Sequence, residues 1–200
     1  TKEERKTIIT RGINNEILKK YNDLSKAYIF EDKALFNKLY DKYSKMVYKF
    51  ILLSDEVDNF LREIEIDSSA SFLDFHNIIS ESLGYDNKQL ASFFLCNEDW
   101  EKEQEITLME MDSSSDVDSY IMEETSLESM VEDEGQRLVY VFDYLTERML
   151  FIELREIFPS KSLDKPVCTK SKGKAPAQVI DFDDFSSPKA GKGGKEFSTD

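Results

Sequence analysis

Few residues able to do acid–base or nucleophilic chemistry occur in this sequence. Of its 200 residues, only His76 is a histidine, and only Cys96 and Cys168 are cysteines. A histidine acts as a general base only when the proton that it takes lies within hydrogen-bond reach. Four apolar residues share the helical face predicted for His76: Phe72, Phe75, Ile79 and Leu83. We therefore expect a buried helix histidine with a hydrogen-bond partner, and we predict no catalytic residue and no enzyme activity.

The two cysteines lie far apart, in regions of different composition. Two thiols build no disulfide framework, and with a single histidine they cannot supply the four ligands of a structural zinc site. Cys96 ends an apolar stretch, so it is predicted to be a small buried hydrophobe rather than a nucleophile. Free thiols are typical of cytosolic proteins, and we expect a cytoplasmic protein without a metal or other cofactor.

Residues 98–134 form a strongly acidic stretch, with 15 Asp or Glu and one Lys. Carboxylates at Asp112, Asp116 and Asp118 offer the oxygen ligands that Ca²⁺ and Mg²⁺ prefer. Their spacing lacks the central Gly and the closing Glu of an EF-hand loop. A solvated acidic loop is the first interpretation, and the alternatives are a cation site or mimicry of nucleic-acid charge.

Three aromatic residues are candidates for contact with a partner. Trp100 lies among Glu and Asp residues, where it either anchors a partner or covers the open end of a sheet. The second interpretation is favoured. In residues 179–185, Phe182 lies between two aspartates and Phe185 follows another, a pattern typical of a peptide that docks in a basic, apolar groove.

Charge is distributed unevenly along the chain. Residues 46–157 hold 7 Lys or Arg and 28 Asp or Glu, a net charge of −21, whereas residues 1–45 carry +4 and residues 158–200 carry +2. A core this acidic repels phosphate, which argues against direct binding of nucleic acid or of an anionic membrane. A basic protein partner fits it better. No apolar run approaches the roughly 20 residues of a membrane-spanning helix, and the first residues lack the apolar stretch of a signal peptide.

The flanks of the core differ from it in composition. All four prolines and four of the seven glycines fall in residues 158–200, which we predict to be a disordered tail. Residues 1–45 are predicted to be a helical N-terminal arm, a hairpin of two helices whose apolar residues recur every three or four positions. Two short helices bury little surface alone, so the arm is expected to pack on the core, on a partner or on a second copy by self-association. The sequence leaves open whether Met46 is an alternative translation start, in which case the arm would be an extension of a shorter protein.

Residues 46–157 are predicted to form an acidic α+β domain with the element order β-β-α-β-β-α-β-β. Alternating or unbroken apolar runs predict strands at residues 47–53, 59–66, 91–97, 105–111, 136–143 and 148–156. Capping boxes that begin at Ser71 and Thr125 predict the starts of two helices, which end at Gly84 and before Gly135. This order predicts an antiparallel or mixed sheet with the helices on one face.

These segments together resemble the Ri-plasmid ORF-3-like family, whose members are often described as insertion-sequence passenger proteins. The resemblance covers residues 47–157: an opening strand hairpin, the helix at residues 72–79, a Gly-Tyr-Asp step at residues 84–86 and a closing hairpin. It implies an α+β fold and no particular reaction. The family usually follows its closing Tyr-Asp-Phe with Gly-Asp and a Trp, whereas this chain has Asp-Tyr-Leu-Thr-Glu at residues 143–147. The resemblance therefore implies that a polar site in that hairpin is altered here.

The acidic surface, the amphipathic arm and the aromatic tail predict a non-enzymatic, cytosolic protein-interaction module with a partner that carries basic charge. The alternative, which the family description suggests, is an accessory protein of mobile DNA that acts through a transposase or another DNA-binding protein.

Overall fold

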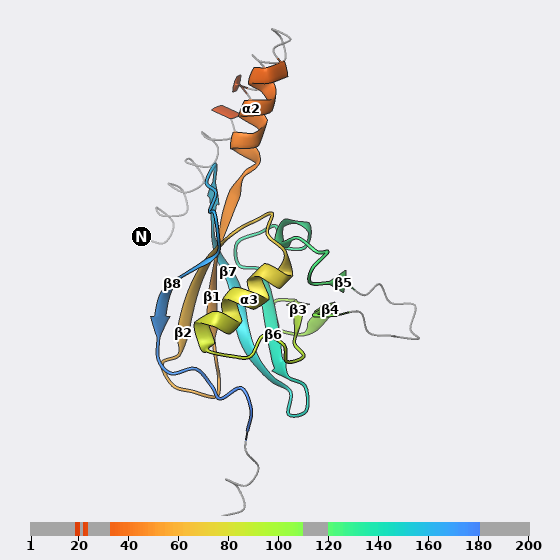
Figure 1. Ribbon diagram of the computed structural model, residues 1–200, viewed down its shortest axis with the longest axis vertical. Helices are drawn as coiled ribbons and strands as arrows, with labels where there is room; N and C mark the ends of the chain where they lie inside the picture. Colours follow the sequence, from red (N-terminus) through yellow and green to blue (C-terminus); the bar gives the residue numbers. More distant parts are fainter. Residues whose placement is uncertain (1–18, 21, 24–32, 110–119, 181–200) are drawn as a thin grey trace, which may run out of the picture.

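One mixed β-sheet forms the centre of the molecule. The computed structural model describes residues 19–20, 22–23, 33–109 and 120–180 (Figure 1). Eight strands pair in the order β5-β4-β3-β6-β7-β1-β2-β8, and all neighbours are antiparallel except β4 and β5, which are parallel. The strands are β1 Met46–Leu53, β2 Leu61–Asp67, β3 Ser92–Cys96, β4 Lys102–Thr107, β5 Tyr120–Ile121, β6 Arg137–Asp143, β7 Arg148–Pro159 and β8 Val167–Lys172. The described part of the chain is therefore an α+β protein with a mixed sheet.

Helix α3 (Phe72–Leu83) lies across one face of this sheet (Figure 1). Its start has the predicted capping box: the Asp74 N–H donates to Ser71 Oγ at 3.1 Å, and the Ser71 N–H donates to Asp74 Oδ2 at 3.0 Å. At its end, Gly84 has a φ of 73°, the left-handed conformation that glycine adopts without strain. Short-range sequence signals thus set both ends of α3.

The core lies between α3 and the sheet and is rich in aromatic rings. Phe75 of α3 stacks on Phe93 of β3 with ring centroids 5.3 Å apart, and its ring lies 4.6 Å from that of Phe50 of β1. All three side chains are fully buried. Aromatic pairs at such separations add about 0.5–1.5 kcal/mol to the free energy of burial. Phe75 therefore fixes α3 over the centre of the sheet.

The second predicted helix is much shorter than expected. Only a 3-10 helix, η1 (Leu127–Ser129), forms there, and the capping box predicted at Thr125 is wrong. Thr125 Oγ1 donates to the carbonyl of Ile121 at 2.8 Å, and the Glu128 carboxylate accepts from the Ser68 hydroxyl at 2.7 Å. Because both side chains bond elsewhere, neither caps a helix. The observed element order also has two strands, β5 and β8, that the predicted order lacks.

Helix α2 (Lys33–Ser44) is the second helix of the predicted arm. It joins β1 through Lys45 alone and projects beyond the sheet (Figure 1). The first predicted helix of the arm lies largely outside the described residues, although residues 19–20 and 22–23 are helical. Within the described residues, no helix is long and apolar enough to cross a membrane.

The prediction of a disordered tail over residues 158–200 is wrong for its first half. β7 continues to Pro159, and β8 pairs with β2 in a register that runs from Val167 opposite Glu65 to Lys172 opposite Leu61. An edge strand is ordered by backbone hydrogen bonds on one side only, so its side chains need not alternate between apolar and polar. Residues 181–200, which include Phe182 and Phe185, lie outside the described residues.

Residues 173–180, here called the strap, continue from β8 past the end of α3. Just before the strap, Arg62 Nη1 donates to the carbonyl of Lys172 at 2.8 Å; within it, the Tyr85 hydroxyl donates to the carbonyl of Pro176 at 2.8 Å. Arg62 is buried, and Tyr85 is half-buried beside the core. The folded domain therefore extends beyond residue 157, the end predicted from the sequence.

We expect Phe75→Ala to lower the free energy of unfolding by roughly 3–5 kcal/mol, because it removes a fully buried ring and leaves a cavity. Glu81→Ala, an exposed position on the same helix, is the matched control and should change it by less than about 0.5 kcal/mol. Urea titration followed by circular dichroism measures both. Equal effects of the two substitutions would contradict the central position of Phe75.

A second prediction compares two glycines with nearly the same backbone conformation. Gly173 has a φ of 71°, and a Cβ there would lie 2.5 Å from the carbonyl oxygen of Asn59, whereas Gly84 has a φ of 73° and nothing within 4 Å. Gly84→Ala should cost about 1 kcal/mol from backbone strain alone. Gly173→Ala should cost roughly 1–3 kcal/mol more, because the backbone must also move. The same urea titration tests this. Equal losses in the free energy of unfolding would show that the close contact between Gly173 and Asn59 does not affect stability.

Candidate interaction surface

His76 lies at the centre of a short buried hydrogen-bond network. It is 1% exposed on α3, facing the sheet. Its Nε2 lies 2.9 Å from the carbonyl oxygen of Asn87, and its Nδ1 lies 2.8 Å from the hydroxyl of Tyr140 on β6. A carbonyl oxygen only accepts, so Nε2 carries the proton and Nδ1 accepts from the Tyr140 O–H. Both ring nitrogens are thereby used inside the protein.

The two titratable groups of this network are held neutral. Burial lowers the pKa of His76, although the hydrogen bond to Asn87 acts in the opposite direction. Burial also raises the pKa of the Tyr140 hydroxyl well above its ordinary value. The arrangement stabilises α3 against β6 and leaves no ring nitrogen of His76 for a substrate.

The cysteines lie on strands that are far apart in the order of the sheet, and both are free thiols. Cys96 ends β3 and is buried, and burial raises the pKa of its thiol. Cys168 lies on the edge strand β8 and is half-buried. A raised pKa keeps a thiol protonated and a poor nucleophile at neutral pH.

The sheet face opposite α3 has an apolar centre of its own. The strand register aligns Phe94, Val139, Phe151 and Leu53 in one row across β3, β6, β7 and β1. Three further apolar residues flank this row, and we call the seven together the open face: Ile51, Leu53, Phe94, Val139, Val141, Met149 and Phe151. Within the described residues, no helix lies over it, because α3 and η1 contribute to the core on the other face and α2 projects beyond the sheet (Figure 1).

The open face is partly accessible to solvent. Val139 and Val141 at its centre are only 1% and 2% exposed, because larger neighbours surround them. Phe94, Phe151 and Met149 are half-buried, and Leu53 is 47% exposed. Most apolar residues of a sheet are buried on one face, so a second apolar face that is only half covered indicates a contact surface.

Trp100 borders the open face. A tight turn positions it: the Trp100 N–H donates to the carbonyl of Asn97 at 3.1 Å, and Trp100 has a φ of 65°. Its ring meets the ring of Phe151 edge-on at 5.1 Å, and the Arg137 guanidinium lies over it at 5.1 Å. Trp100 thus lies against the sheet. It remains half-exposed at the border, where a partner would meet it.

An acidic cleft of about 660 Å³ adjoins this border. The turn after β3 contributes Glu98 and Asp99, and the turn before β6 contributes Asp133 and Glu134, all four exposed. Arg137 lines the cleft as well and links it to Trp100. Neighbouring carboxylates that outnumber the cations attract a basic group. The predicted ligand loop at Asp112, Asp116 and Asp118 lies outside the described residues.

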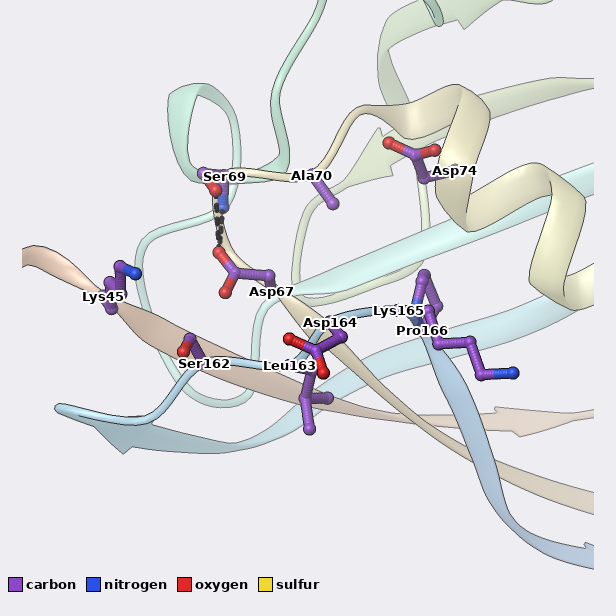
Figure 2. Close-up of a pocket in the computed structure, with 10 residues that line it drawn as sticks. All are labelled: Lys45, Asp67, Ser69, Ala70, Asp74, Ser162, Leu163, Asp164, Lys165 and Pro166. Carbon is purple, nitrogen blue, oxygen red and sulfur yellow. Dashed lines mark hydrogen bonds between the residues drawn. The ribbon is translucent and has the colours of Figure 1, made fainter.

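A second cleft, of about 380 Å³, lies where α3 starts (Figure 2). Figure 2 shows Asp67 bonded to Ser69, whose hydroxyl donates to it at 2.7 Å. Asp74 is engaged in the cap of α3, and Lys45 and Lys165 also line the cleft. Among the described residues, no group of three or more His, Cys, Asp or Glu has the arrangement of a metal site. The cleft has mixed charge, and its apolar lining is limited to Ala70, Leu163 and Pro166, so the open face is the stronger candidate.

The open face was not identified from the sequence, because its residues come from four strands. One signal was present: residues 138–142 form an unbroken apolar run, and all five lie on alternating sides of β6 with less than 3% exposure. An unbroken run in a strand indicates burial of both faces. The core domain has a single long helix, which can cover one face of the sheet. The apolar run therefore indicates that the other face is covered by something else.

We predict that His76 makes the domain less stable in acid. Its folded-state pKa is lowered, so its contribution is complete above the unfolded pKa of about 6.5 and is lost as the pH falls through the folded pKa. His76→Gln should cost about 1–3 kcal/mol at pH 7 through lost hydrogen bonds, and the difference from the wild type should shrink between about pH 7 and pH 5. Urea titrations of both proteins at each pH measure this difference. A difference that is constant over this range would show that His76 titrates equally in both states.

The comparisons with known proteins agree with this architecture. No curated protein matches the chain. A crystal structure of a protein of unknown function from Methanosarcina mazei Go1 has a TM-score of 0.53 and 20% identity to this chain, over 66% of this chain and 72% of that one. This likeness shows a shared fold. The family described as plasmid pRiA4b ORF-3-like protein matches residues 46–184, which include β8 and the strap. The resemblance noted in the sequence is thereby confirmed and extended toward the C-terminus, and the chain belongs to the plasmid pRiA4b ORF-3-like family.

Proposed function

We propose that this chain is a non-enzymatic protein-interaction module of the cytosol, and that it binds its partner with the open face of the sheet. The observation that carries the proposal is the row of Phe94, Val139, Phe151 and Leu53, which no described helix covers. A large apolar surface on a folded domain is characteristic of a contact with another protein.

The energetics of the open face support a binding role. Burial of apolar surface contributes roughly 25 cal/mol per Å², so covering Leu53 and the half-buried rings of Phe94 and Phe151 favours association. Aromatic residues at the centre of such a patch commonly contribute most of the binding energy. Trp100 at the border adds another ring that a partner would contact.

The charge around the open face supports a partner with basic groups. Glu105 lies on the same side of the sheet, as do Glu63 and Glu153, which are paired with Lys170 and Arg155. The acidic cleft, where exposed carboxylates outnumber the cations, adjoins Trp100 and carries this argument. Complementary charge raises the rate of association and excludes acidic partners. Phosphate groups are repelled by the same charge, so the partner is a protein rather than a nucleic acid.

A second candidate function is that of an accessory protein of mobile DNA. The family description refers to a plasmid, and the net charge of −21 over residues 46–157 would attract the basic surface of a transposase or another DNA-binding protein. This role uses the same surface and differs only in the identity of the partner.

Site-specific photo-crosslinking tests the proposed surface. p-Benzoylphenylalanine placed at Leu53, in the full chain, should crosslink a defined protein in native lysate, because this position is the most exposed of the open face. The same probe at Leu145 is the control, since this residue is 92% exposed in the hairpin turn between β6 and β7 and outside the open face. Phe151→Lys in the Leu53 probe protein should reduce the yield by about tenfold or more.

Two outcomes would count against the proposal: equal crosslinking from both probe positions, or an undiminished yield with Phe151→Lys in a protein whose melting temperature is unchanged. The sequence of the crosslinked protein separates the two candidate functions. A DNA-binding protein supports the role in mobile DNA, and any other protein supports the general module.

A further inference from the structure

We propose that the acidic cleft beside Trp100 receives an arginine side chain of the partner, and that Arg137 occupies this place in the free protein. The proposal rests on the proposed function, because it names the group by which the partner of the open face is recognised. The observation behind it is that one guanidinium, that of Arg137, already lies over the Trp100 ring and lines the cleft.

Two turns form the cleft, and hydrogen bonds hold both of them. In the turn after β3, the side-chain oxygen of Asn97 accepts from the N–H groups of Asp99 and Glu101 at 2.9 and 3.0 Å. In the turn before β6, the Gly135 N–H donates to the carbonyl of Leu154 on β7 at 2.7 Å. The cleft is therefore formed before a partner arrives, and binding costs little ordering of this chain.

The charge of the cleft is not balanced within the protein. Four carboxylates line it together with a single cation, Arg137, which leaves a net charge of −3. All four are exposed, and none forms an ion pair with another described residue: Glu98, Asp99, Asp133 and Glu134. On β2, by contrast, Glu63 is already paired with Lys170 at 3.0 Å. The cleft thus attracts a cation of the partner.

The aromatic ring beside the cleft favours arginine over lysine. Among aromatic residues, tryptophan attracts a cation most strongly. The planar guanidinium of arginine stacks on such a ring and can donate two parallel hydrogen bonds to a carboxylate, whereas the ammonium of lysine is a compact charge without a planar face. The Cζ atom of Arg137 lies 5.1 Å from the centre of the Trp100 ring. The structure therefore already contains a guanidinium in the arrangement that we assign to the partner.

One segment of a partner can contact the cleft and the open face together. Trp100 meets Phe151 of the open face edge-on at 5.1 Å. Arg137 lies two residues before Val139 on β6, so both point to the same side of the sheet, about 7 Å apart along the strand. A partner that covers Phe151 with an apolar side chain can therefore place a neighbouring arginine in the cleft.

Arg137 is in this arrangement a competitor of the partner. It neutralises part of the charge of the cleft and covers one face of the Trp100 ring. Its removal would change the net charge of the lining from −3 to −4 and would uncover the ring. Loss of Arg137 should therefore strengthen the binding of an arginine, although most substitutions in a binding surface weaken binding.

The test is a titration of the full chain with the acetylated and amidated peptide Ala-Leu-Arg-Leu-Ala. The fluorescence of Trp100, the only tryptophan of the sequence, reports binding at the cleft, and isothermal titration calorimetry gives the dissociation constant independently. We expect saturable binding that weakens as salt is added. The peptide with lysine in place of arginine should bind about threefold more weakly. The peptide with citrulline, which has nearly the same shape but no charge, should bind about tenfold more weakly.

Three variants of the full chain locate the effect. Arg137→Gln should bind the arginine peptide about two- to fivefold more tightly. Lys102→Gln is the matched control, because it also removes one positive charge, but Lys102 Nζ lies over the Phe94 ring at 4.8 Å and does not line the cleft. It should change the affinity by less than about twofold. Asp133→Asn, at an exposed position, should weaken binding about two- to fivefold with an unchanged melting temperature.

Equal affinities for the arginine and citrulline peptides would overturn the proposal, and so would equal affinities for the arginine and lysine peptides. Equal effects of Arg137→Gln and Lys102→Gln would overturn it as well, because overall charge would then explain the gain. If the probe at Leu53 crosslinks a partner while the arginine peptide does not bind, the proposed function stands and only this inference fails. If the peptide binds as expected while the probe crosslinks no protein, the arginine site stands and the proposed function fails.

Discussion

The structure depends on one imbalance: the central strands are apolar on both faces, but of the two 12-residue helices in the described part of the chain only α3 covers them. Phe75 of α3 stacks on Phe93 and contacts Phe50, and this packing closes the first face. On the other face, Val139 and Val141 are buried, while Leu53 remains half-exposed. A single-layer sheet can be stable with one covered face, so the second face is available for another protein.

Titratable groups in the interior are neutral or hydrogen-bonded, whereas most acidic groups lie charged at the surface. His76 is kept neutral by burial, and its two ring nitrogens are used by Asn87 and Tyr140. Arg62 is buried as well, and it donates to backbone carbonyls that include that of Lys172. The acidic residues, by contrast, lie mostly at the surface, where water screens them. The negative charge therefore contributes little to the fold and mainly selects what approaches the protein.

Sequence reasoning succeeded where the deciding contacts are local and failed where they are distant. Both ends of α3 follow from Ser71, Asp74 and Gly84, all within or next to the helix. The strand β8 was predicted as tail because its order comes from β2, about a hundred residues earlier, and its own exposed side chains show no alternation. The capping box at Thr125 failed for the same reason: Glu128 bonds to Ser68, a contact that no local pattern contains. The family resemblance identified the core but ended before the strap.

The open face shows why a proposed binding surface is harder to predict from sequence than a fold, and also why it can be tested separately from the fold. Its row joins residues 53, 94, 139 and 151, which become neighbours only once the register of four strands is known. Phe75 and the open face contribute differently to stability, because loss of a fully buried ring leaves a cavity, while a change at half-exposed Leu53 leaves the core intact. Substitutions at Leu53 are therefore expected to change folding little, so that their effect on the proposed association can be measured separately. The side of the sheet opposite α3 is thus where selection for a partner can act without loss of the fold.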